Sequence, residues 1–486
     1  MQSSIRSSIK ELLERQLDWL YRGARVCVVA GLLGCSIGFG QTPINQNHQP
    51  NPQSQISEED LRHLSLAKAT ELLIAHNLSV AAARYNVDAV RAQRIAAELR
   101  PRPTLTFSAT QFAIPRVFLH PSTLGKTSSD NVAANTVYTL EVDQLIERGN
   151  KRQLRTTQAE LNAQAAEAQL KDSLRQQVFQ LRQAFLAALL ARENLRIVKE
   201  NLEHFNSTER VLFVQVKEGY SAGVDLKRVQ LQQLQFQSDV TTSEQGYEQS
   251  LRDVFNLIGA GDATSFANSP ELTRTGGTPS ATPGLDGSLN VIDGSLEIIP
   301  TLLWIDDLRQ MALANRPDIR AAEISLQAAQ KGVELAEAQR ARDVTVGAQY
   351  SRTGSDNTTG LVVSVPLQTR RFANSATAQA LATRHEAEAQ LRLVKTQALT
   401  EVEKAFTAYN ASRERLRLFT GGALNTATDV RRIEEIAYRD GGKGLLDYLD
   451  AQRAFNQTLL GYNQARYDFL LSLYQLEFAT GTTLVK

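Results

Sequence analysis

Cysteine is nearly absent from this chain of 486 residues, which has only Cys27 and Cys35, both near its start. No disulfide framework or cysteine-based metal site can therefore hold the fold. The six histidines are scattered without the spacing of metal ligands, so we expect no metal site and no cofactor. Only 13 prolines interrupt a chain dominated by Ala, Leu, Gln, Glu and Arg, which is the composition of long helices.

An excess of charge of either sign is also missing, because 53 basic residues balance 52 acidic ones along the chain. A nucleic-acid partner, which normally requires a basic face or stripe, is not expected. There is no glycine-rich phosphate loop and no nucleophile motif in a strand–turn–helix context. Asp447 and Asp450 could form a carboxylate pair, but no pocket-forming α/β pattern surrounds them. We therefore expect a protein that is not an enzyme.

The N-terminal residues 1–40 have the order of a secretory signal peptide. Arg22 and Arg25 precede the apolar run VCVVAGLLGCSIGFG, which ends in the small-x-small triplet at residues 38–40. The run is too short for a comfortable membrane span. We expect an exported protein.

A second cleavage site is possible at LLGC, which resembles a lipobox and would make Cys35 a lipid-anchored N-terminus. The alternative is a cysteine inside a discarded signal peptide. Residues 41–60, rich in Asn, Gln and Pro at their start, are typical of a flexible lead-in. No later segment is apolar for long enough to form a transmembrane helix, so membrane insertion would have to use β-strands.

The remaining chain is a tandem duplication. The string AEAQL occurs at residues 166–170 and again at 387–391, and AHNLSVAAARYNVDAV from Ala75 aligns with ANRPDIRAAEISLQAA from Ala314. Further pairs keep one offset of 222 residues: Gly219/Gly441, Asp225/Asp447, Gln230/Gln452, Gln235/Gln457 and Gly259/Gly481. We place the first repeat at 61–259 and the second at 304–486. The linker 260–303 is rich in Gly, Ser, Thr and Pro and is expected to be partly ordered at best.

Each repeat begins with one predicted helix, at 61–99 and 304–340, and ends with long helices, at 148–258 and 370–480. Their apolar residues have coiled-coil spacing, as in Leu170, Leu174, Val178, Leu181, Phe185 and Ala188. Between these helices the period changes to two, which predicts β-hairpins at 104–145 and 343–367. The fold class is thus mainly α with a membrane β-part, built from a duplicated unit.

Four strands cannot close a membrane barrel, since the smallest single-chain barrels use about eight. Unless the strands stay as isolated hairpins, several chains must pool them, and a trimer would supply twelve strands, an even number compatible with closure. One face of the strands is expected to meet lipid, and the Thr and Ser residues are expected to face the lumen. The lipid-facing residues are Leu105, Phe107, Val344, Val346, Leu361, Val363, Val365 and Leu367.

The segment YRDGGKGLLDYLDAQ at 438–452 resembles the Y-x-x-G-x-x-x-x-x-D-x-L-D-A signature of the TolC family of outer-membrane efflux channels. The segment VKEGYSAGVDLKRVQ at 216–230 is a weaker copy, with Val216 in place of the aromatic residue. Together with the duplicated unit behind a signal peptide, the resemblance covers nearly all of residues 61–481.

This resemblance implies a homotrimer with a twelve-stranded barrel in outer-membrane lipid and a helical tube in the periplasm. The tube would dock with a periplasmic adaptor protein and an inner-membrane pump, in an efflux or type I secretion system. The channel would be a passive conduit for small molecules, ions or proteins, because the pump supplies the energy. The resemblance leaves the cargo open.

The resemblance also implies a gate at the helical tips. Asp447 and Asp450 match paired aspartates that face the pore, where three copies would form acidic rings. The alternative for both is an ordinary exposed helix acid near a turn.

Tyr438 and Lys443 match positions that bond to a neighbouring helix pair and hold the tip shut, and Asp225 matches the acid they reach. Lysine in place of arginine keeps the charge but loses the bidentate fork. Gly219 and Gly441 are expected to serve the tip turns, where glycine adopts positive φ at little cost.

A periplasmic coiled-coil structural protein is the main alternative function. It explains the helices but not two hairpins at equivalent positions in the two repeats. The two hypotheses differ in whether the apolar strand face requires lipid or detergent.

Overall fold

The computed structural model describes residues 61, 63–110, 137–220, 222–260, 291–296, 303–367 and 370–484. The predicted signal peptide with Cys35, the lead-in to residue 60 and most of the linker lie outside the described residues. No helix within the described ranges is both long enough and apolar enough to cross a membrane.

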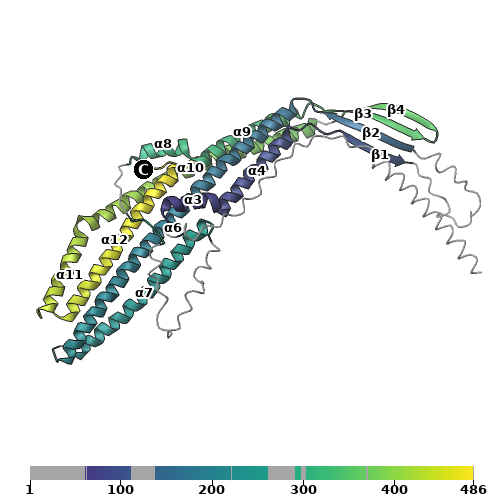
Figure 1. Ribbon diagram of the computed structural model, residues 1–486. Helices are drawn as coiled ribbons and strands as arrows, with labels where there is room; N and C mark the ends of the chain where they lie inside the picture. The colour runs from purple at the N-terminus through teal and green to yellow at the C-terminus, as the bar shows by residue number, and fades with distance from the viewer. Residues whose placement is uncertain are drawn as a thin grey trace, which may run out of the picture. The chain divides into compact units, whose positions relative to one another are not determined.

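Both repeats follow the same order of elements, shown in Figure 1. The first repeat consists of α3 (Leu66–His76), α4 (Leu78–Glu98), β1 (Thr104–Thr110), β2 (Val137–Ile146), α6 (Lys151–Lys217) and α7 (Gly223–Leu257). The second consists of α8 (Ile305–Asn315), α9 (Pro317–Ala338), β3 (Val344–Thr353), β4 (Asp356–Ser364), α10 (Arg370–Leu418), α11 (Leu424–Arg439) and α12 (Leu445–Thr480).

The prediction of a single helix at the start of each repeat is wrong. Asn77 separates α3 from α4 with an extended backbone, at ψ 124°, and its side chain accepts a hydrogen bond from the amide of Val80. Arg316 separates α8 from α9 with the same ψ, immediately before Pro317. Proline disfavours helical φ/ψ at the residue before it, and asparagine is a favoured N-cap, so both breaks have local causes.

The two breaks make equivalent contacts with the ends of the return helices. The Asn77 amide donates to the carbonyl of Leu257 at 2.8 Å, and the Arg316 guanidinium donates to the carbonyl of Ala479 at 3.2 Å. Each contact caps an orphan carbonyl in the last turn of α7 or α12. The duplication therefore extends to the hydrogen bonds that join the first helix of a repeat to its last.

A glycine with positive φ completes each junction. Gly259 follows α7 at φ 80°, and Gly481 follows α12 at φ 72°. A Cβ at Gly259 would lie 2.7 Å from the carbonyl oxygen of His76, and one at Gly481 would lie 3.3 Å from that of Asn315. Glycine is required here both for its conformation and for the close approach of the broken helix.

Arg316 also forms two ion pairs at its junction. Its guanidinium contacts Asp318 and Glu401, each at 2.6 Å, and its side chain is only 3% exposed. Burial acts to raise the pKa of Asp318, but the hydrogen bonds and charge of Arg316 outweigh it, so this pKa is lowered. The carboxylate therefore stays ionised and paired.

The main hydrophobic core lies around these junctions. It contains buried residues from α3, α6, α7, α8, α10 and α12, including Leu181, Tyr247 and Phe469. Part of the predicted linker belongs to it, because Ile292 and Leu296 are almost fully buried. Residue 292 forms a parallel bridge with Leu64, so the segment 291–296 is attached to the core through Ile292 and Leu296, while residues 293–295 are exposed.

The outgoing long helices of the two repeats differ. The α6 helix runs for 67 residues without interruption. Its counterpart is divided by a π-turn at Phe419–Ala423, in which Gly422 has φ 139°. The sequence prediction of long helices over 370–480 did not include this break, although Gly421-Gly422 is a recognisable signal for a kink.

We expect Arg316→Met to lower the free energy of unfolding by about 2–4 kcal/mol, because it removes the main partner of Asp318, which keeps only Arg175 at 3.8 Å as an ion pair, and the partner of the Ala479 carbonyl. Denaturant unfolding of the detergent-solubilised protein measures this. Arg320→Met is the matched control, since Arg320 is 66% exposed and its ion pair with Glu323 spans 3.9 Å.

The Asp318 contribution is present above the ordinary aspartate pKa and is lost as the pH falls through the lowered pKa of the folded state. The stability gap between wild type and Arg316→Met should therefore narrow in acid. Equal losses for Arg316→Met and Arg320→Met at neutral pH would contradict this account.

Candidate functional site

The four strands form one antiparallel sheet in the order β1-β2-β3-β4 (Figure 1). The first hairpin joins the second through β2 and β3, which pair along ten residues from Val137↔Thr353 to Ile146↔Val344. The two repeats therefore share a single sheet. Within the described residues, β1 and β4 are its edges, and each edge strand leaves backbone hydrogen-bonding groups unpaired.

The register places the large apolar side chains on one face. Leu105 lies opposite Val142, and Phe107 lies opposite Leu140. Directly paired residues share a face, and alternate residues along each strand do so too. We call this side of the sheet the apolar face. Its large apolar residues are Leu105, Phe107, Tyr138, Leu140, Val142, Ile146, Val344, Val346, Tyr350, Leu361 and Val363, and Gln144, Arg352, Asn357 and Thr359 lie on the same side.

This apolar face is uncovered in the single chain. Leu105, Phe107 and Leu361 are 69%, 67% and 84% exposed. The predicted grouping of six of its residues on one face is confirmed by the register, while Val365 and Leu367 follow the end of β4 and are also exposed. Single exposed apolar residues are common on protein surfaces, but here the apolar surface spans four strands. Such a surface has to be covered by lipid or by a partner.

The opposite face is polar and closely fitted at one point. Its residues include Thr104, Thr106, Ser108, Thr139, Glu141, Asp143, Thr345, Gly347, Gln349, Ser351 and Thr358. Gly347 lies opposite Asp143, and a Cβ at position 347 would overlap the Asp143 carboxylate. Gly347 is not among the residues predicted from the sequence, although a glycine inside a strand pattern is a signal for such a close contact.

At the other end of the long helices, a second hydrophobic cluster joins the two helix pairs. Phe205 and Leu212 of α6, Val229 of α7, and Leu445 and Leu449 of α12 form its buried part. We call this set the tip cluster. Tyr438 of α11 packs against it and stacks on Tyr448, with ring centroids 5.5 Å apart.

Asp447 and Asp450 lie in the first two turns of α12, away from the tip cluster. Both are exposed, whereas Leu445 and Leu449 on the same helix are buried. Asp450 forms an exposed i,i+3 ion pair with Arg453 at 3.3 Å. The two carboxylates thus lie on a solvent-accessible side of the helix, within one turn of each other.

Asp225, Tyr438 and Lys443, the residues predicted to hold the tip shut and called the latch below, are only partly brought together within this chain. Lys443 pairs with Glu434, and this hydrogen bond and charge raise the lysine pKa. Asp225 pairs with Arg228 at 3.3 Å. Burial, followed by the charge of Asp225, raises the pKa of Tyr438, whereas Lys443 contacts Glu434 and not Asp225.

Gly219 and Gly441 occupy turns that close the two helix pairs, with φ of 79° and 75°. Nothing lies within 4 Å of a Cβ built at either position. Conformation, and not close packing within the chain, therefore requires glycine at both turns. One further link between the pairs, absent from the sequence predictions, is the hydrogen bond from Arg453 of α12 to Gln232 of α7 at 3.1 Å.

Comparison with known proteins gives two kinds of match. The family model described as "Outer membrane efflux protein" matches residues 69–260 and 308–482. A search of curated proteins finds no relative with a significant match. Among solved structures, the chain is similar to the outer membrane protein VceC of Vibrio cholerae, at 19% identity and a TM-score of 0.64, covering 86% of this chain and 97% of that one.

Two further structures have the same fold. The CmeC outer membrane channel of Campylobacter jejuni matches at 15% identity and a TM-score of 0.65, covering 86% of this chain and 85% of that one. The MtrE outer membrane channel of Neisseria gonorrhoeae, solved in an open state, matches at 16% identity and a TM-score of 0.64, covering 86% and 89%.

We expect Gly347→Ala to destabilise the sheet by about 1–2 kcal/mol, because the added methyl group displaces the Asp143 carboxylate. Thermal unfolding in detergent measures the effect. Gly360→Ala is the matched control on the neighbouring strand, since nothing lies within 4 Å of its Cβ position. Adding Asp143→Ala to Gly347→Ala should recover most of the loss; no recovery would contradict the steric explanation.

Proposed function

The chain belongs to the outer membrane efflux protein family, and from this membership we propose that three copies form the outer-membrane channel of a tripartite efflux or secretion system. The protein is an outer-membrane efflux channel subunit, and family members are passive channels. We propose that this chain likewise catalyses no reaction. Its conduit would join a periplasmic adaptor and an inner-membrane pump, and the pump would supply the energy.

The apolar face of the four-stranded sheet is the observation that carries the trimer proposal. A sheet with one exposed apolar face and one polar face is suited to lipid on one side and water on the other. The unpaired edges β1 and β4 cannot remain open in lipid, where backbone groups have no water to bond. Pairing β4 of one chain with β1 of the next satisfies both edges, and three chains give a closed ring of twelve strands.

The alternative of a periplasmic coiled-coil structural protein fits the long helices but not this sheet. In water, the apolar face and its two open edges would favour aggregation. A channel subunit accounts for the helices and the strands together, because the helices extend the conduit beyond the membrane.

We further propose that the helical tips are the gate of the channel. Asp447 and Asp450 would form two rings of negative charge in a trimer, close enough to the pore to attract cations and repel anions. Asp225, Tyr438 and Lys443 would link neighbouring helix pairs and keep the tips together. Each exposed link contributes only about 0–1 kcal/mol, so closure would require several of them.

Membrane fractionation tests the proposed function. We expect the protein in the outer-membrane fraction, and after detergent extraction we expect a trimer that separates into single chains only on heating. The oligomer should be lost or aggregate when detergent is removed, because the apolar sheet face needs a cover. A soluble rod that is independent of detergent would favour the structural alternative.

Planar-bilayer recording tests the gate with two double variants that serve as controls for each other. Asp447→Asn/Asp450→Asn should shift the reversal potential toward lower cation selectivity, since it removes six charges per trimer, with conductance changed less. Asp225→Ala/Lys443→Ala should raise the conductance severalfold while selectivity changes little. Unchanged conductance in the second variant would reject the latch, and unchanged selectivity in the first would place the acids outside the pore.

A further inference from the structure

Basic residues are concentrated where the helices meet the strands. Residues 98–103, 147–152, 339–343 and 365–371 flank the four strands at this junction, and they contain nine basic residues, eight of them arginine, against three acidic ones. This excess contrasts with the balanced charge of the whole chain. We call eight of these basic residues the junction collar: Arg100, Arg102, Arg148, Lys151, Arg152, Arg340, Arg342 and Arg371.

The acids of this region are largely occupied by their own partners. Asp343 pairs with Lys151 at 2.8 Å, and Glu147 pairs with Arg155 at 2.7 Å. Among the described residues, no ion pair is formed by six other collar side chains, five of which are exposed: Arg100, Arg102, Arg148, Arg152, Arg340 and Arg342. The positive charge at the junction is therefore available to a ligand.

At the opposite end of the sheet, the described residues do not show this excess. In residues 108–110, 137–139 and 351–358, the charged side chains are Arg352 and Asp356 alone. Within the part of the chain that the structure describes, the basic excess thus lies at one boundary of the apolar face.

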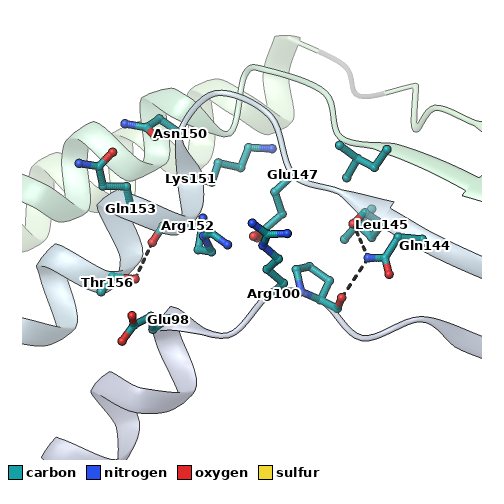
Figure 2. Close-up of a pocket in the computed structure, with 12 residues that line it drawn as sticks. Glu98, Arg100, Gln144, Leu145, Glu147, Asn150, Lys151, Arg152, Gln153 and Thr156 are labelled. Atoms are coloured by element: carbon teal, nitrogen blue, oxygen red, sulfur yellow. Dashed lines mark hydrogen bonds between the residues drawn. The ribbon is translucent and has the colours of Figure 1, made fainter.

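Two of the collar arginines share an open hollow of about 910 Å³ beside the end of β2. In Figure 2, Arg100 extends from the segment that enters β1, and Arg152 extends from the first turn of α6, on two sides of this hollow. Neutral polar side chains also line it, including Gln144, Asn150 and Thr156. Two acids, Glu98 and Glu147, and one lysine, Lys151, line it as well, but Glu147 is paired with Arg155 and Lys151 with Asp343. The hollow therefore offers two guanidinium groups and several neutral hydrogen-bonding groups, against Glu98 as its remaining acid.

The walls of the hollow are fixed by hydrogen bonds. Gln144 donates to the carbonyl of Pro101 at 3.0 Å, which ties the end of β2 to the entry of β1. Arg155 donates to the carbonyl of Ala97 at 3.1 Å, and Lys151 donates to that of Ala341 at 2.7 Å. Hydrogen bonds within and between the two repeats thus hold in place the segments that carry these arginines.

We infer that this hollow, with the junction collar, binds the phosphate group of an anionic phospholipid at the boundary of the membrane. The inference rests on the proposed function, which places the apolar strand face in lipid. A lipid whose tails lie against that face would have its headgroup at the level of the collar. Arginine suits this ligand because its planar fork forms two hydrogen bonds with phosphate oxygens, whereas lysine acts as a point charge. Basic residues near a membrane surface also attract anionic lipid without a shaped pocket, and the hollow adds the shape.

Native mass spectrometry of the intact oligomer in a neutral detergent tests the inference. Titration with phosphatidylglycerol is compared with phosphatidylcholine, which has the same tails and no net charge. We expect tighter binding of phosphatidylglycerol, and we expect Arg100→Gln/Arg152→Gln to weaken it about tenfold. Arg210→Gln/Arg392→Gln is the matched control, because it removes two exposed arginines from the long helices, and it should bind like wild type.

A second variant provides the test if Arg100→Gln/Arg152→Gln does not fold. Arg100→Lys/Arg152→Lys keeps the charge and removes the forks, so binding about threefold weaker than wild type is expected. Equal binding of the two lipids, or wild-type affinity in both collar variants, would overturn the lipid site. Displacement of the bound lipid by millimolar inorganic phosphate would assign the hollow to a soluble anion and overturn it as well.

Bilayer recording of the same preparation separates this inference from the proposed function. Channels that conduct but show no preference for phosphatidylglycerol would reject the lipid site alone. A protein that neither enters membranes nor conducts would reject the proposed function, and the lipid site with it.

Discussion

The contact between the broken first helix and the end of the return helix is the constraint on which each repeat depends. Asn77 and Arg316 occupy equivalent breaks, and each donates a hydrogen bond to a carbonyl in the last turn of its return helix, that of Leu257 or Ala479. The positive-φ glycines that follow allow the two backbones to approach closely. The main core surrounds these contacts. They therefore fix the point from which the helices extend to the tips in one direction and to the sheet in the other.

The two sides of the core carry different surfaces, which suit one chain to both membrane and water. On one side of the core, the strands of both repeats pair into a single sheet with an apolar and a polar face. On the other side, the tip cluster joins the two helix pairs around a few buried side chains and leaves their acids in solvent. A membrane part and a water-exposed tube require these opposite surfaces, and alternation in the strands and helical periodicity in the tips produce them separately.

The two repeats differ in the continuity of their long outgoing helices. The α6 helix is continuous, whereas its counterpart has a π-turn containing Gly421-Gly422. The α11 helix below this turn has no buried residues, so it is held less firmly than the corresponding part of α6. At the tips, the second repeat therefore has the less tightly packed helix. The signature segment at 438–452 begins at the end of this α11 helix, in the same repeat.

The sequence by itself determined the duplication, the helical and strand periods, and the family, because each is carried by spacing along the chain. The apolar strand residues could be grouped on one face from alternation alone. The tertiary structure decided that Lys443 pairs with Glu434 across a tip turn. It also decided what depends on contacts between distant residues: the hydrogen bonds that join the two helix breaks to Leu257 and Ala479, the burial of Ile292 and Leu296 from the linker, and the pairing of β2 with β3. These contacts join residues whose separation in sequence carries no local signal, so only the packed chain could specify them.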